Sequence, residues 1–460
     1  MAQFWTDSSL LLALQADLST PSTLAAAEFV PILCDVPKVT FNTEVSELEL
    51  LTGQVGAAPE RIVGRRSGSV TFDIPLQGFK DGYDPTAENP GGAPVGGVEV
   101  IPPWLVLFAN ALGCNVEALA GATLSDKNTN FWRGTFLSNS PYGAAKVTAA
   151  GTNSTALQMD VGEGANHKAG EFIAAALSAV IVPFVGFTKT KAVDLCTIFE
   201  ATRAAAPNYD DNAANVYGSS TAWQSDDQPR FFTAYWVGPD PKLCYVLTGL
   251  VCESVKISLD AGAVPVASFS FRFYDYRANN TLGGLIVPDA YDRTPQLVGN
   301  KSGQLMLDTA SKCGLEGVSL EWKCTIKENK CHYAPEGIDS VAIIKPRISL
   351  GFTIPHDKDD AIYDAAGAPA ATGSHNWQSS LELGTTHSVG IYVGPSVGRS
   401  LGLILPAAYV VAAPAIADRD GVQAYTVQLE AGSYSGDSTD TPADTSSNSP
   451  LDALFKIGMA

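Results

Sequence analysis

The amino-acid sequence predicts a mainly β fold with short helices, in which two copies of one β-sandwich or half-barrel domain follow each other. The first observation is a repeat: residues 61–75 and 341–355 both alternate polar and apolar residues and both end in Phe-x-Ile-Pro. The second is its context, since a strand pair with a polar arm precedes each copy, and a Trp-led stretch, a Val-Gly-Pro hairpin and two closing strands follow it. The third is composition, because 42 Gly, 28 Pro and only 4 Met are typical of strands joined by turns.

Residues 1–30 are predicted to form an N-terminal arm, either a short amphipathic helix or an extended segment that docks elsewhere. A signal peptide is not expected, because the segment lacks a basic region and Gln15 and Asp17 interrupt its apolar run. No membrane insertion is expected either, since the most apolar stretch, 172–187, contains Pro183 and Gly186 and is typical of buried strands.

The repeat sets the expected domain boundaries. The first domain comprises residues 31–142 and 230–278, and the second comprises 301–436 after a linker at 279–300. Between the Trp-led stretch and the Val-Gly-Pro hairpin the first copy is far longer than the second, which predicts a small inserted β domain at 143–229. Residues 437–460 are expected to be a tail, with a flexible Ser/Thr/Asp/Pro segment before a short apolar hook that needs a groove on a neighbour.

A polar, Gly-rich arm separates the strands of the first pair, and the second half has an arm of similar length at 327–340. Because such an arm forms no core of its own, it is expected to contact a partner surface. Arg61, Arg65 and Arg66 suit salt bridges to a neighbouring subunit better than a nucleic-acid patch, given the acidity around them. The candidate contact residues of the two arms are Gln54, Glu60, Arg61, Arg65, Arg66, Glu328, Lys330, Glu336 and Asp339.

The charge balance restricts the function. A net charge of −19 and a pI near 4.6 argue against a general nucleic-acid or anionic-membrane binder, which needs basic patches. The 8 Cys residues include no C-x-x-C pair, so reduced thiols in the core and folding in a cytosol are expected.

No catalytic motif is found, and no enzymatic activity, cofactor or metal is predicted. A zinc site at Cys313, Cys324, Cys331 and His332 lacks a recognised ligand spacing. The acidic segment 356–364 lacks EF-hand geometry and is interpreted as a solvated loop. Trp104 and Trp377 are interpreted as core aromatics rather than ligand platforms.

The order of elements, the stretch PPWLVLFANALGC at 102–114 and the closing strand GVQAYTVQLEAGSY at 421–434 resemble the tail tube (major tail) proteins of long-tailed, siphovirus-type bacteriophages. The resemblance implies tail-tube-type domains whose inner sheets join in a ring around a lumen, and two fused domains per chain imply a homotrimer with pseudo-six-fold symmetry. It also implies stacked rings contacted through the arms, and a place in the virion tail after assembly in the host cytoplasm. The implied partners are further copies of the chain and tape-measure, baseplate or distal-tail, and tail-terminator proteins, while DNA passes through the lumen without specific binding.

The strands expected to line the ring come from the repeated segments. Their candidate residues are Val70, Phe72, Ile74, Phe269, Phe271, Phe273, Leu350, Phe352, Ile354, Tyr425, Val427 and Leu429. The acidic composition is compatible with a negative lumen along which DNA moves without adhering. Two alternatives stay open: a carbohydrate-binding or adhesin-like β protein of the virion or cell surface, and a hydrolase with a site between its domains.

Overall fold

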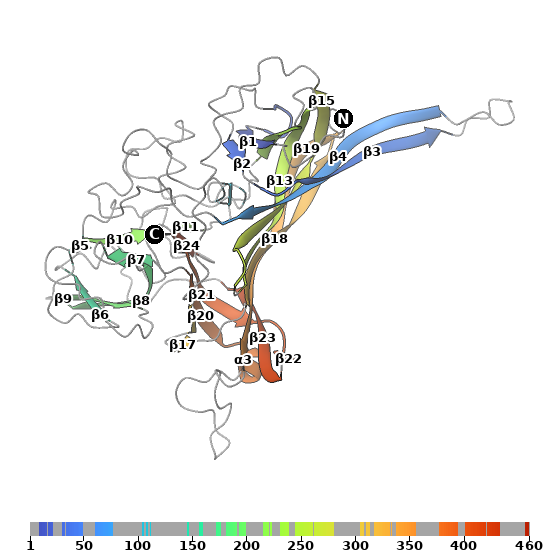
Figure 1. Ribbon diagram of the computed structural model, residues 1–460. Coiled ribbons are helices and arrows are strands. Elements are labelled where there is room, and N and C mark those ends of the chain that lie inside the picture. The colour runs from blue at the N-terminus through green and yellow to red at the C-terminus, as the bar shows by residue number, and fades with distance from the viewer. Residues whose placement is uncertain are drawn as a thin grey trace.

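The computed structural model is mainly β, as the sequence predicts, and it is dominated by antiparallel strands (Figure 1). The structure describes residues 9–15, 17–21, 30–32, 34–48, 60–76, 104, 107–108, 111, 145–146, 156–159, 172–175, 181–190, 193–198, 215–219, 221–222, 231–238, 244–260, 262–279, 304–307, 310–312, 317–331, 333, 337–355, 377–393, 401–419, 421–432 and 456–459.

The main feature is a long run of hydrogen-bonded antiparallel strands, which we call the inner sheet. Strands from the first half of the chain form one side of it, and strands from the second half form the other. In spatial order they are β3 (Lys38–Leu48), β4 (Glu60–Pro75), β14 (Val266–Phe273), β13 (Cys244–Asp260), β18 (Gly317–Lys330), β19 (Ile338–Pro355), β23 (Val422–Ala431) and β22 (Ala415–Arg419).

Each half adds further strands that form a second layer. The strands of this layer in the first half are β2 (Val30–Ile32), β1 (Ser9–Gln15), β12 (Phe231–Val237), the first part of β13, and β15 (Asp275–Asn279). Those in the second half are β17 (Ala310–Lys312), β16 (Gln304–Leu307), β20 (Thr386–Val393), β21 (Leu401–Val410) and β24 (Lys456–Met459). Strand β11 (Thr221–Ala222), which precedes β12 in the chain, pairs with β24. Residues 9–15 of the N-terminal segment are therefore extended, and the C-terminal strand β24 pairs with β21 of its own chain.

The repeat seen in the sequence recurs in the strand register. Phe72 of β4 lies opposite Phe269 of β14, and its counterpart Phe352 of β19 lies opposite Val427 of β23. The hairpins β3–β4 and β18–β19 each carry a register shift near the same point, between Thr43 and Val45 and between Lys323 and Thr325. One difference between the halves is that β13 runs on as a single strand where the second half has the two separate strands β21 and β22.

Alternation along the inner strands places one set of side chains in the core. In β14 every second residue is buried, and the aromatic rings of Phe72 and Phe271 stack with centroids 5.8 Å apart. Helix α3 (Trp377–Leu383) adds Trp377, whose ring meets Phe352 edge-on at 5.8 Å. Gly384, at φ +63, follows the helix, where glycine tolerates the left-handed conformation. In the first half, Trp104, Leu107, Phe108 and Ala111 are helical and buried, which agrees with the interpretation of Trp104 as a core aromatic.

A separate sheet is formed by strands that lie in sequence between the Trp-led stretch and β12. In spatial order they are β5 (Ala145–Lys146), β10 (Asn215–Ser219), β7 (Phe172–Ala175), β8 (Ile181–Thr190), β9 (Val193–Ile198) and β6 (Ala156–Met159). Strand β8 contacts β20 and β21, so this sheet lies beside the second half (Figure 1). Within the described ranges, none of the helices is long and apolar enough to cross a membrane.

Candidate assembly interface

The two halves of the inner sheet meet at one strand pair, β13 against β18. Residues Ser254 to Asp260 pair with Lys323 to Gly317 in a continuous antiparallel register. Opposite one another on the core side stand Ile257 and Leu320, 1% and 3% exposed, and Val255 and Trp322, 1% and 2% exposed. This internal junction is therefore closed by both backbone hydrogen bonds and apolar burial.

The two outermost strands of the inner sheet, β3 and β22, lack such a neighbour. Among the described residues β3 pairs only with β4, and β22 pairs only with β23. Large apolar side chains are exposed at both places: Phe41 is 37% and Val45 49% exposed at the β3 edge, while Ile416 is 65% exposed in β22. An unpaired strand edge with apolar side chains is a surface on which another chain can add a strand.

The register relates these exposed residues to buried ones in the other half. Because Phe72 and Phe352 are counterparts, the pairings place Trp322 of β18 in correspondence with Phe41 of β3. The pairings with β14 and β23 likewise place Ile257 of β13 in correspondence with Ile416 of β22. Two of the residues that close the internal junction, Trp322 and Ile257, thus have exposed apolar counterparts in the outermost strands.

The two hairpin arms also differ in their surroundings. The β18–β19 arm packs on the first half, where Ile338 and Val341 are buried in a cluster with Leu18, Val251 and Tyr274. The β3–β4 arm extends away from the body as a ribbon (Figure 1). One arm is docked within the chain, and the other presents its surface to solvent.

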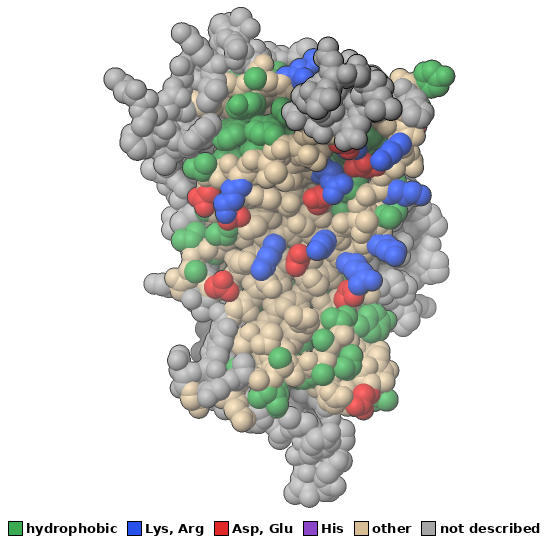
Figure 2. Space-filling model, turned by 90° about the vertical axis from the view of Figure 1, so that its right-hand side faces the viewer, with side chains coloured by type: hydrophobic (Ala, Val, Ile, Leu, Met, Phe, Trp, Pro, Cys, Tyr) green, Lys and Arg blue, Asp and Glu red, His purple; other side chains and the backbone are tan. Residues whose placement is uncertain are grey.

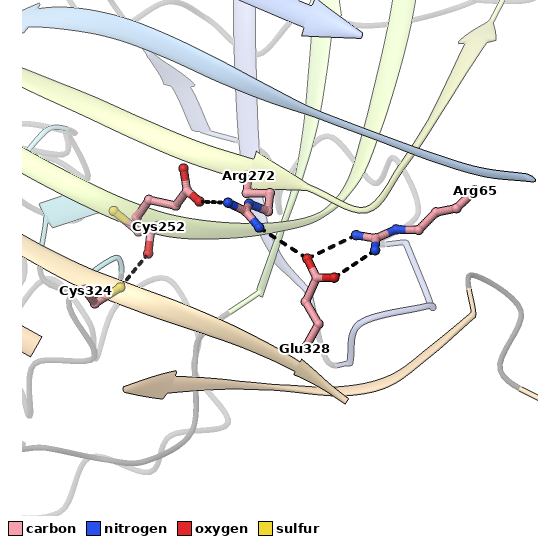
Figure 3. A network of polar contacts seen from close by, with 6 residues as sticks. Arg65, Cys252, Arg272, Cys324 and Glu328 are labelled. Atoms are coloured by element: carbon pink, nitrogen blue, oxygen red, sulfur yellow. Dashed lines mark hydrogen bonds and ion pairs between the residues drawn. The ribbon is translucent and has the colours of Figure 1, made fainter. Parts of the chain in front are cut away.

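A network of charged side chains holds the docked arm (Figure 3). Glu328 of β18 accepts hydrogen bonds from Arg65 of β4, with Nη1–Oε2 2.8 Å and Nη2–Oε1 3.2 Å. Arg272 of β14 contacts Glu328 at 3.3 Å and Glu253 of β13 at 2.6 Å. The Arg65 guanidinium also lies 5.0 Å from the ring centre of Tyr274. The network therefore ties strands of both halves together.

This network changes the pKa of Glu328. Hydrogen bonds from Arg65, followed by the charges of Arg65 and Arg272, lower the pKa of its carboxyl against the opposing effect of burial. Burial raises the pKa of the neighbouring Tyr274 hydroxyl, which stays neutral. With 17% of its side chain exposed, Glu328 is shielded enough for this pairing to exceed an ordinary surface ion pair.

The arm candidates predicted from the sequence lie in different environments. Arg65 and Glu328 meet each other within one chain, whereas salt bridges to a neighbouring subunit are expected from the sequence. Arg66 donates to the backbone oxygen of Tyr276 at 3.4 Å. Glu60 and Arg61 lie in β4 opposite Leu48 and Glu47. Lys330 and Asp339 are exposed on the β18–β19 arm, and Gln54 and Glu336 lie outside the described residues.

One exposed arm residue, Tyr333, is not predicted from the sequence. Tyr333, near the tip of the β18–β19 arm, is 98% exposed. A tyrosine this exposed on a hairpin tip is available for contact, but alternation within strands gives no signal for a residue in a turn. At the tip, the Cys331 backbone nitrogen donates a hydrogen bond to the Gly337 backbone oxygen at 3.0 Å, which holds the two strands of the arm together.

The residues predicted from the sequence to line the ring face the core instead. The structure buries every one of them in the core: Val70, Phe72, Ile74, Phe269, Phe271, Phe273, Leu350, Phe352, Ile354, Tyr425, Val427 and Leu429. A side chain that lines a channel must face solvent, so these residues cannot do so, although their strands do have an open face. The alternate residues on that face include Ser69, Thr71, Ser268, Ser270, Ser254, Ser258, Ser319, Ser349, Thr426 and Gln428.

Charges on this open face are mixed rather than negative. Figure 2 shows Lys, Arg, Asp and Glu scattered over a surface of other side chains and backbone. The strand alternation places basic and acidic residues there in near balance: Lys38, Lys256, Arg272, Lys323 and Arg347 with Asp73, Asp260, Glu321 and Glu430. The net charge of −19 is therefore not concentrated on this face.

Of the cysteines considered as metal ligands, Cys324 is buried in the core and Cys331 lies half-buried at the tip of the β18–β19 arm. Cys324 donates a hydrogen bond to the Cys252 oxygen at 3.4 Å, and burial raises its pKa to about 12, which favours the thiol. In the parts of the chain that the structure describes, no group of three His, Cys, Asp or Glu side chains could hold a metal ion. Cys313, His332 and the acidic segment 356–364 lie outside those parts.

Comparison with known proteins gives no family assignment. No protein-family model matches the chain, and no curated protein is similar to it.

Proposed function

We propose that this chain is a structural virion protein that forms the stacked rings of a phage tail tube, the family that its sequence resembles. The observation that carries the proposal is the inner sheet, in which two repeats are joined by a closed junction while both outermost strands, within the part of the chain that the structure describes, have one open edge with exposed apolar side chains. Such a sheet completes its hydrogen bonding when its edges meet those of further copies, and ring closure removes every edge.

The repeat supports a homotrimer. With two repeats in each chain, three chains give a ring with pseudo-six-fold symmetry, in which junctions within and between chains alternate. The contacts between chains are heterologous, since the β3 edge of one copy meets the β22 edge of the next. A heterologous contact closes into a ring when the rotation at each junction divides a full turn evenly.

The open face supports a conduit for nucleic acid. Among the described residues of this face, small hydroxyl side chains and balanced charges leave no continuous basic strip that would neutralise phosphates. Because counterion release at basic residues dominates the affinity for DNA, a face of this kind lets DNA pass without being held. The channel of the proposed ring is neutral and polar.

The arm tips supply the proposed contacts between rings. Tyr333, with the exposed Lys330 and Asp339 on the same arm, offers an aromatic and charged contact surface at the end of a narrow hairpin. At the two ends of the tube, the same surfaces would meet tape-measure, tail-terminator and baseplate or distal-tail proteins.

The test is negative-stain electron microscopy of two purified samples, the unchanged protein and the Tyr333→Ser variant. The proposal expects rings or tubes of uniform diameter for the unchanged protein, and single rings without stacking for the variant. Asp17→Asn, an exposed residue of the N-terminal segment that belongs to neither β3 nor β22, serves as a control that should leave tubes intact. A monodisperse monomer at every protein concentration, above all one that binds a cell-surface polysaccharide, would contradict the proposal and favour an adhesin-like protein.

A further inference from the structure

The internal junction fixes in detail how one copy of the chain meets the next. We propose that β22 of one copy pairs antiparallel with β3 of a second copy in the register of the β13–β18 junction, so that Ala415 lies opposite Thr40 and Ile416 opposite Val39. This inference rests on the proposed function and specifies its partner surface: a second copy of this chain, joined through these residues.

The register follows from the pairings that both halves share. At the internal junction Lys256 lies opposite Glu321 and Ile257 opposite Leu320. Through their pairings with β14 and β23, Lys256 and Ile257 correspond to Ala415 and Ile416. Through β4 and β19, Glu321 and Leu320 correspond to Thr40 and Val39. Replacing each residue of the internal junction by its counterpart gives the proposed pairing.

Exposure supports the second copy as the occupant. Trp322 is 2% exposed at the internal junction, while its counterpart Phe41 is 37% exposed. Ile257 is 1% exposed and its counterpart Ile416 is 65% exposed. Val251, 1% exposed beneath the docked arm, corresponds to Tyr409 at 39%. The free edges thus carry apolar residues at the positions that the internal junction covers.

Residue types in the arms follow the same correspondence. Arg65 of β4 and Glu328 of β18 bind each other within the chain, and their counterparts are Lys345 of β19 and Glu47 of β3. A basic residue on one copy and an acidic residue on the next therefore take the positions of the pair that holds the docked arm. In the proposed contact the β3–β4 arm of one copy docks on the second half of its neighbour, as β18–β19 docks on the first half of its own chain.

Thiol cross-linking tests the register. Ala415→Cys and Thr40→Cys are combined in one chain, because both positions are exposed and lie outside the core. A short bis-methanethiosulfonate linker then joins only cross-strand neighbours, which lie roughly 5 Å apart. Lys256→Cys with Glu321→Cys, opposite each other at the internal junction, calibrates the reaction within one chain. The unchanged protein and the single-cysteine variants set the background from native cysteines.

The control for register is Ala415→Cys with Asn42→Cys, which moves one thiol two residues along the same face of β3. The proposal expects covalent trimers from the 40/415 pair on denaturing gels, with at least tenfold less product from the 42/415 pair. Rings that form but cross-link equally at both pairs, or at neither, overturn the proposed register and leave the tube function standing. A protein that stays monomeric under the microscope, without cross-links, overturns both.

Discussion

The two hairpin arms have corresponding sequences and opposite surroundings. The β18–β19 arm lies on the first half of its own chain, with Ile338 and Val341 buried and Glu328 held by two arginines. The β3–β4 arm carries a register shift near the same point and is of similar length, yet its residues Phe41 and Val45 are exposed. In the proposed ring, the second half of a neighbouring copy does for the free β3–β4 arm what the first half of the same chain does for the docked β18–β19 arm.

The largest expected difference between the two regions concerns Trp322 and Phe41. Trp322→Ala should reduce the free energy of unfolding by about 3–5 kcal/mol, because it empties a buried site at the internal junction. Phe41→Ala should cost only about 1 kcal/mol in an isolated subunit, since it loses partly exposed ring contacts with Tyr276 and Tyr245. Chemical denaturation of dilute protein measures both.

A milder change keeps this comparison informative if Trp322→Ala does not fold. Trp322→Phe places at the internal junction the residue that β3 carries at the corresponding position. Both variants are compared in dilute protein, provided that both fold. If Trp322→Phe and Phe41→Ala then lower the free energy of unfolding equally, the internal junction is not more tightly packed than the β3 edge.

The next effect concerns the charged network of the docked arm. Glu328→Gln should lower the free energy of unfolding by about 1.5–3 kcal/mol, because Arg65 and Arg272 lose a charged hydrogen-bond acceptor. Asp339→Asn, exposed on the same arm, is the matched control and should change it by less than about 0.5 kcal/mol. Thermal or denaturant unfolding distinguishes them, and equal effects would contradict the role given to the network.

The same network predicts a pH dependence. The pKa of Glu328 is lowered in the folded state from an ordinary value of 4.5, so its contribution to stability is fully present above that value. As the pH falls below 4.5 toward the folded-state pKa, the unfolded chain binds more protons and this contribution is lost. Unfolding curves between pH 6 and about pH 3 should therefore show a smaller acid-induced loss for Glu328→Gln than for the unchanged protein. Identical acid profiles would contradict the lowered pKa.

The smallest effect on stability is expected at the free β22 edge. Ile416→Ser replaces a side chain that is 65% exposed, so the isolated subunit should change by less than about 0.5 kcal/mol. Assembly should weaken clearly, which sedimentation of protein at increasing concentration measures. Assembly equal to that of the unchanged protein would show that the β22 edge is not a contact surface.

Much of the architecture could be predicted from local pattern. The Phe-x-Ile-Pro endings locate strands β4 and β19, because period-two alternation is a local property of the sequence. The same alternation, applied strictly, also assigns Phe72 and Phe352 to the core rather than to a channel, since the apolar set of a strand faces inward.

The candidate interface depends on contacts that local pattern does not contain. Arg65 and Glu328 are 263 residues apart in sequence, and only the joining of β13 to β18 brings them together. The apolar run Leu10–Leu12 suits a helix as well as a buried strand, and its pairing with β12 and β2 makes it a strand. Strand β24 likewise pairs with β21 of its own chain, where the sequence suggests a hook for a neighbour's groove.

Hydrogen exchange of the backbone amides tests the central claim most directly, because edge pairing must protect amides that are open in a single subunit. Exchange is compared by mass spectrometry between dilute protein and protein assembled at high concentration. We expect peptides covering β3 and β22 to become protected on assembly, while those covering β13 and β18 exchange slowly in both samples. Assembled protein in which β3 and β22 exchange as fast as in dilute protein would contradict it.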